Sequence, residues 1–109
     1  MRRVEKPWGY EIIWAETAEY VGKILHINAG HRLSRQYHNV KEETLYVLSG
    51  TLCNYGDGEE IERYHPGEAF HVVPKQVHRF GALENDVEVV EVSTPHLDDV
   101  VRLADDYTR

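Results

Sequence analysis

Short apolar runs, not helical repeats, carry the hydrophobic pattern of this chain. The runs are rich in Val, Ile, Tyr and Phe, and Gly, Pro and Asn residues interrupt them. Runs of this length and composition predict β-strands. We expect strands at residues 10–15, 20–28, 33–38, 43–49, 51–55, 59–64, 69–73, 77–82 and 87–93. Many short strands with closely spaced turns are typical of an all-β sandwich or barrel.

The turns and the C-terminus complete this prediction. Gly56-Asp57-Gly58 predicts a tight hairpin turn because Gly and Asp tolerate positive φ, and His65-Pro66-Gly67 and Glu84-Asn85-Asp86 predict further turns. After Pro95 the pattern changes, and apolar residues recur at roughly helical spacing between Leu97 and Ala104. We therefore expect one short C-terminal helix that packs on the outside or the end of the barrel.

Length, charge and cysteine content narrow the class of protein. A chain of 109 residues is long enough for one domain, residues 1–109, and too short for two. The single Cys53 cannot form an internal disulfide, and no apolar run is long enough to span a membrane or act as a signal peptide. These features predict a cytoplasmic protein with no membrane partner. The net charge of −7 argues against nucleic acid as a partner, because phosphate binding needs a basic face.

Four polar residues lie in a pattern that suits a metal ion. Gln36 and His38 are two residues apart on an expected strand, so their side chains point to the same face. Glu43 begins the next strand, and His78 lies near the start of a distant one. Two imidazoles, a carboxylate and an amide oxygen suit one divalent ion, such as zinc, manganese, iron, cobalt or nickel. An isolated His on a strand is more often a hydrogen-bonded structural residue, so the assignment depends on the wider spacing.

That spacing follows two blocks. The first reads Gly-x5-Gln-x-His-x4-Glu-x6-Gly from Gly30 to Gly50, and the second reads Gly-x6-Pro-x3-His from Gly67 to His78. The blocks resemble the two motifs of the cupin superfamily. In that superfamily a His usually stands where this chain has Gln36, and the second motif has one residue fewer before its Pro and a Gly in place of Gln76. The resemblance implies an all-β, single-domain cupin barrel that holds one metal ion through Gln36, His38, Glu43 and His78.

Four stretches of the chain resemble a narrower family. They are residues 6–11, 30–38, 73–79 and 98–109, which contain Lys-Pro-Trp-Gly-Tyr-Glu, Gln-Tyr-His, Val-His-Arg and Asp-Asp-Val-Val-Arg. They resemble segments of the type II phosphomannose isomerase domain found in mannose-1-phosphate guanylyltransferases. In this family Gln already replaces the first cupin His. The resemblance implies interconversion of mannose 6-phosphate and fructose 6-phosphate through an enediol, with a small sugar phosphate as the substrate.

An aldose–ketose isomerase needs a polarised carbonyl, a base and a cationic group for the phosphate. The metal would polarise the carbonyl. Arg79 and Lys23 match a family Arg and Lys, which implies that Arg79 is catalytic or binds substrate and that Lys23 binds substrate; the alternative for Arg79 is a salt-bridge partner at a strand end. The base stays open: a metal-bound hydroxide, Glu43 as a catalytic residue, or one of His26, His31 and His71.

Two other function classes compete with the isomerase. Two His and one carboxylate also form the facial triad of iron oxygenases, so a small iron-dependent oxygenase is one alternative. A non-catalytic cupin that binds a sugar or a sugar nucleotide is the other. We also expect a homodimer, because small barrels often pair through outer strands, with the strand at residues 10–15 as a plausible exchange element.

Overall fold

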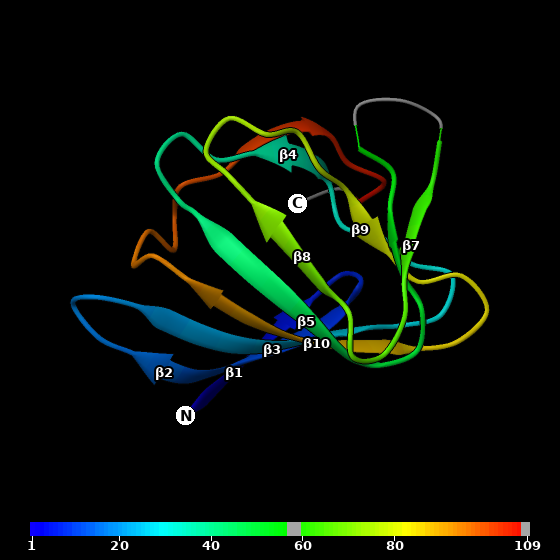
Figure 1. Ribbon diagram of the computed structural model, residues 1–109, viewed down its shortest axis with the longest axis horizontal. Coiled ribbons are helices and arrows are strands. Elements are labelled where there is room, and N and C mark those ends of the chain that lie inside the picture. The colour runs from blue at the N-terminus through cyan, green and yellow to red at the C-terminus, as the bar shows by residue number, and fades with distance from the viewer. Residues whose placement is uncertain (57–59, 108–109) are drawn as a thin grey trace.

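The computed structural model describes residues 1–56 and 60–107, and over these residues the structure is all β (Figure 1). The described residues contain no helix, so none of them forms a helical segment that could cross a membrane. The strands are β1 (Arg2–Lys6), β2 (Gly9–Glu16), β3 (Val21–Ile27), β4 (Arg35–Tyr37), β5 (Glu43–Ser49), β6 (Leu52–Asn54), β7 (Glu62–Tyr64), β8 (Ala69–Val72), β9 (Phe80–Gly81), β10 (Val87–Ser93) and β11 (Val101–Ala104).

The strands form three antiparallel sheets that enclose one core. A large sheet has the order β1-β2-β3-β10-β5-β8, and two small sheets have the orders β7-β6-β9 and β11-β4. Figure 1 shows β4 and β11 on the side of the molecule opposite to β1, β2 and β3. Because consecutive side chains alternate between the two faces of a strand, every second residue of the large sheet points into the space between the sheets.

The inward positions change character along the strands. Leu25 on β3, Val89 on β10 and Leu45 on β5 are 3%, 0% and 1% exposed and belong to the apolar core. Two residues further along β3 and β10, the same inward row continues with Lys23 and Glu91, which lie opposite each other in the register. The apolar core therefore fills one end of the barrel, and buried charged side chains line the other.

Trp8 and Gly9 lie at the start of β2 and allow close packing there. The Trp8 side chain is 3% exposed and packs in the core cluster. Gly9 has a φ of 153°, and a Cβ atom there would lie 1.9 Å from the backbone oxygen of His26. Only glycine allows the β2 backbone to approach β3 this closely.

Most of the expected strands are confirmed within a few residues. At the C-terminal end one prediction is wrong, and at the N-terminal end one strand was not predicted. The expected C-terminal helix is replaced by β11, in which Val101 pairs with Tyr37 and Arg102 with Gln36 of β4. Hydrogen bonds to β4 and β-branched Val100 and Val101 outweigh the weak helical spacing. β1, whose residues are mostly charged, was not predicted because it lacks an apolar run. The hairpin turn expected at 56–58 extends beyond the described residues.

Candidate metal centre

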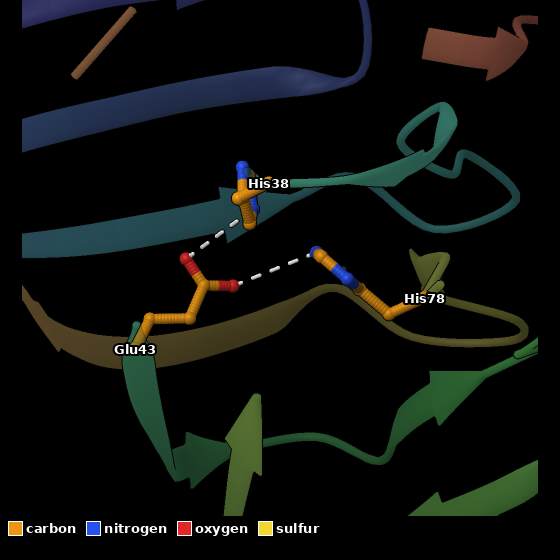
Figure 2. Close-up of side chains that lie close together, drawn as sticks. All are labelled: His38, Glu43 and His78. Atoms are coloured by element: carbon orange, nitrogen blue, oxygen red, sulfur yellow. Dashed lines mark ion pairs between the residues drawn. The ribbon is translucent and has the colours of Figure 1, made fainter. Parts of the chain in front are cut away.

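His38, Glu43 and His78 come together inside the barrel, at the charged end of the cavity. Their candidate ligand atoms all lie within 4.8 Å of one another (Figure 2). The Nε2 atom of His38 is 3.8 Å from Oε2 of Glu43, and the Nε2 atom of His78 is 3.6 Å from Oε1 of the same carboxylate. Two atoms that share an ion at about 2.1 Å stand no more than about 4.2 Å apart, so both distances fit a common ligand sphere.

The backbone explains why residues so distant in sequence meet. Gln36 and His78 exchange two hydrogen bonds, from Gln36 N–H to the His78 carbonyl at 3.0 Å and from His78 N–H to the Gln36 carbonyl at 2.9 Å. Glu43 enters from the first position of β5. Gln36 is half-buried and lines the same cavity, so its amide is near the group, and its role as a fourth ligand stays a prediction.

Hydrogen bonds orient both imidazoles for binding a cation. The Nδ1 atom of His38 is hydrogen-bonded to the backbone oxygen of Asp99, and that of His78 to the backbone oxygen of Gln76 at 3.1 Å. A carbonyl oxygen can only accept a hydrogen bond, so the Nδ1 atom of each ring must be the donor and carry the proton. The Nε2 atom of each ring then has a free lone pair, which points toward Glu43. Burial lowers the pKa of His38, and burial lowers the pKa of His78 to about 4. Both rings are therefore neutral at pH 7, as metal binding requires.

Glu43 shares its buried surroundings with a second carboxylate and a lysine. The ammonium of Lys41 lies 2.9 Å from Oε2 of Glu43 and 3.2 Å from Oε2 of Glu91. Burial, with repulsion from Glu91, raises the pKa of Glu43 to about 7, although Lys41 opposes this. Burial disfavours the charged form of Lys41, but the attraction of Glu91 and Glu43 outweighs it and raises the Lys41 pKa. Burial also opposes ionisation of Glu91, yet Lys41 and Lys23 lower the Glu91 pKa.

The cavity has a volume of about 260 Å³, and charged side chains line it in addition to the three candidate ligands. Lys23 faces it with 7% exposure, and its ammonium lies 3.4 Å from Oε1 of Glu11, which also lines the cavity. Arg102 of β11 lies at the cavity wall with an exposed side chain. Lys23 therefore lies in the cavity lining, and its role in substrate binding stays a prediction.

Arg79 is placed differently from Lys23. Its guanidinium donates to the Leu33 carbonyl at 2.9 Å and to Oδ1 of Asp106 at 2.9 Å, and the residue is 3% exposed. The residues that line the cavity include His78 but not Arg79, because neighbouring strand residues face opposite sides. Its catalytic or phosphate-binding role stays a prediction, and these contacts favour the alternative of a buried salt-bridge partner.

The three histidines that were candidate bases lie away from the cavity lining. His26 is bonded to Asp86 and Glu88, His31 to Tyr107, and His71 to Glu42. The cavity lining instead includes three charged residues to which the sequence analysis assigned no role, Glu11, Lys41 and Glu91. A fourth such residue, Asp99, is bonded to the ligand residue His38. The inward alternation of β10 could have identified Glu91, whereas the sequence contains no signal for the contact between Asp99 and His38.

We predict that the chain binds a divalent ion through these residues. His78→Ala should weaken binding of Zn²⁺, Mn²⁺ or Co²⁺ by at least about 100-fold, because removing a ligand costs more than the 10–100-fold typical of groups that support one. Isothermal titration measures the affinity. His71→Ala is the matched control, since its ring is half exposed and bonded to Glu42. Equal affinity of wild type and His78→Ala would reject the site.

Metal affinity should also depend on pH in a defined range. A pKa of about 7 means that a proton occupies Glu43 below pH 7 and has to leave when an ion binds. The affinity should fall by at least about tenfold for each pH unit from pH 7 to pH 5, since His78, with a pKa of about 4, stays neutral there and protonation of His38 would only add to the fall. Titrations over this range in wild type and Glu43→Gln measure the slope. A wild-type affinity that is constant from pH 5 to 7 contradicts the prediction.

Comparison with known proteins agrees with this architecture. The family described as cupin domain matches residues 23–93. Quercetin 2,3-dioxygenase from Bacillus subtilis is 34% identical over 68 residues, which are 62% of this chain and 20% of the relative, so the chain spans about a fifth of that protein. KdgF from Halomonas sp. shares the fold at a TM-score of 0.78 and 23% identity, covering 90% of this chain and 89% of that one. A sugar phosphate isomerase of the cupin superfamily from Silicibacter pomeroyi has a TM-score of 0.69 and 16% identity over 78% of this chain and 58% of that one. The chain belongs to the cupin domain family.

Proposed function

We propose that this cupin is a divalent-metal-dependent isomerase of a small sugar phosphate, with mannose 6-phosphate and fructose 6-phosphate as the leading substrate pair. The observation that carries the proposal is the composition of the cavity around His38, Glu43 and His78. Buried lysines and carboxylates line it, and its volume of about 260 Å³ is below the ~300–1,000 Å³ of sites for drug-sized ligands. Such a site suits a compact, hydroxyl-rich molecule.

The proposed reaction moves a proton between C1 and C2 of the open-chain sugar. The two imidazoles and Glu43 would hold the ion, which when bound polarises the substrate carbonyl. The ammonium of Lys41 stabilises negative charge that develops beside Glu43, since it lies in a buried, weakly screened position. We assign the base to one of the cavity carboxylates, Glu11, Glu43 or Glu91, because His26, His31 and His71 lie outside the cavity lining.

The phosphate needs a cationic group at the cavity wall. Lys23 and Arg102 both line the cavity, from β3 and β11 respectively. Arg102 has an exposed side chain, so it can bind a phosphate that remains partly in water. We propose that these two side chains bind the phosphate, with Lys23 doing so beside its ion pair with Glu11, whereas Arg79 lies outside the cavity lining.

A small iron-dependent oxygenase is the second candidate. Two observations favour it: the local identity of 34% to quercetin 2,3-dioxygenase, and a donor set of two His and one carboxylate. The cavity volume of about 260 Å³ argues against a multi-ring aromatic substrate for this chain. A non-catalytic sugar-binding or sugar-nucleotide-binding cupin would have the same site and no turnover.

The decisive test is a coupled assay for fructose 6-phosphate formed from mannose 6-phosphate with Zn²⁺, Mn²⁺, Co²⁺, Ni²⁺ or Fe²⁺ added in turn. We expect turnover with at least one ion. Arg102→Gln should raise KM about tenfold because it removes a charge-assisted bond worth about 1.5–3 kcal/mol. Arg63→Gln, on β7 and outside the cavity lining, is the control. Binding of the sugar without turnover would establish the non-catalytic alternative, and oxygen uptake by the Fe²⁺ form would establish the oxygenase.

The outer face of the large sheet supports the expected homodimer. Ile12, Ile24, Val90 and Tyr46 lie side by side across β2, β3, β10 and β5 in the strand register. Trp14, Tyr46, Leu48 and Val92 expose 43%, 48%, 45% and 49% of their surface on this face. The six strands are four to eight residues long, at about 3.4 Å per residue, and stand about 4.8 Å apart, which gives a flat face of roughly 600 Å². This area approaches the ~800 Å² per partner of a stable interface. We propose that a second copy covers this face.

Light scattering coupled to size exclusion should give twice the chain mass of 12.7 kDa for the wild type. Val92→Glu should shift the protein to the monomer mass, because it places a charge within the apolar face. Leu103→Glu, on β11 and 53% exposed, is the matched control and should stay dimeric. A wild-type mass of one chain at about 100 μM would reject the dimer.

A further inference from the structure

We propose that Asp99 is a positioning residue for the metal centre: it fixes the ring of His38 and the backbone that carries Lys41. Asp99 lies in the C-terminal segment between β10 and β11, far along the chain from both residues that it holds. The proposal rests on the candidate metal site and does not depend on the isomerase reaction.

Asp99 binds the segment after β4 with both its main chain and its side chain. Its backbone carbonyl accepts the Nδ1 proton of His38. Its carboxylate accepts three successive backbone N–H groups, from Asn39 at 3.0 Å, Val40 at 2.7 Å and Lys41 at 2.9 Å. Hydrogen bonds from the N–H groups of Lys41, Val40 and Asn39 lower the pKa of Asp99 to about 2, so the carboxylate is ionised at pH 7.

These contacts determine where the groups around Glu43 lie. The segment between His38 and Glu43 has no strand pairing, so its N–H groups are not fixed by a neighbouring strand, and the N–H group of buried Lys41 requires another acceptor. The single carboxylate of Asp99 accepts three of these N–H groups and so fixes the curvature of the segment. The same segment carries Lys41, whose ammonium lies 2.9 Å from Glu43. One residue thus positions a ligand imidazole and the cation beside the ligand carboxylate.

The C-terminal segment is itself anchored at its far end. Asp106 forms two bonds to Arg32, at 2.6 and 3.1 Å, and one to Arg79 at 2.9 Å. Between these anchors and Asp99, Val100 and Arg102 line the cavity. Asp99 is therefore held by strand pairing and ion pairs on its C-terminal side, and it can act as a fixed support. This arrangement also gives buried Arg79 a structural purpose.

The test measures Co²⁺ affinity by isothermal titration and by the visible absorption of the bound ion, without any sugar present. Asp99→Asn keeps the backbone carbonyl that holds His38 but replaces one carboxylate oxygen with an amide donor, which faces N–H groups. We expect Co²⁺ affinity to fall 10–100-fold, as for other groups that orient a ligand. The ¹⁵N shifts of the His38 ring should also move from a single Nδ1–H tautomer toward a mixture.

Asp86→Asn is the matched control. Asp86 also ties a loop, through the Ala29 N–H at 2.8 Å and His26 at 3.1 Å, but away from the cavity lining. It should retain wild-type Co²⁺ affinity even if it lowers stability. If Asp99→Asn does not fold, Asp99→Glu retains the charge on a longer arm and should still lose affinity at least several-fold. Co²⁺ affinity within threefold of wild type, or an equal loss in Asp86→Asn, overturns the proposal. Failure of the isomerase assay alone leaves it standing.

Discussion

The structure depends on the burial of the Glu43 carboxylate. Glu43 is 4% exposed, and the nearby carboxylate residue Glu91 is also 4% exposed. A lone buried carboxylate is costly unless a charge and hydrogen bonds offset it. Lys41 lies within 3.2 Å of both carboxylates, and Lys23 also attracts both. Burial and repulsion from Glu91 nevertheless raise the pKa of Glu43 to about 7. Near neutral pH the protonated and ionised forms of Glu43 are therefore close in free energy, and a divalent ion would favour the ionised form.

Strand register contributes to this condition by placing charged inward residues next to the apolar core. Glu91 pairs with Lys23 on one side and with Leu45 on the other, so charged and apolar inward residues meet where the core ends. The two neutral imidazoles then complete the group without adding charge, because backbone carbonyls hold their protons on Nδ1. Glu43 is therefore the candidate ligand that has to lose a proton when a metal ion binds near pH 7. The same low-dielectric surroundings strengthen every interaction that a bound substrate makes there.

Local pattern and spacing predicted the parts of the molecule that repeat with a period of two or follow a fixed motif. The strands that contain Leu25, Leu45 and Val89 alternate clearly, and the spacing from Gln36 to His78 identified the residues that meet. Contacts between distant segments were not predictable. The helical spacing around Leu97 gave way to pairing of β11 with β4, and the sequence did not indicate the contacts of Arg79 with Leu33 and Asp106. Glu91 was predictable from the alternation of inward and outward residues along β10, whereas the motif that contains Asp99 gave no indication of its contact with His38.

The residues of the candidate site come from inside and outside the range that matches the cupin domain family. The cupin domain match covers residues 23–93, which include Lys23, the ligands His38, Glu43 and His78, and Lys41 and Glu91. Glu11 lies before that range, while Asp99 and Arg102 lie after it, yet all three line the cavity or hold its ligands. The matched range therefore supplies the candidate ligands and the charged groups beside them, and the flanking segments supply Glu11, Arg102 and the hydrogen bond from His38 to Asp99. Under the proposed function, the segments outside the matched range would contribute to substrate contacts through Glu11 and Arg102.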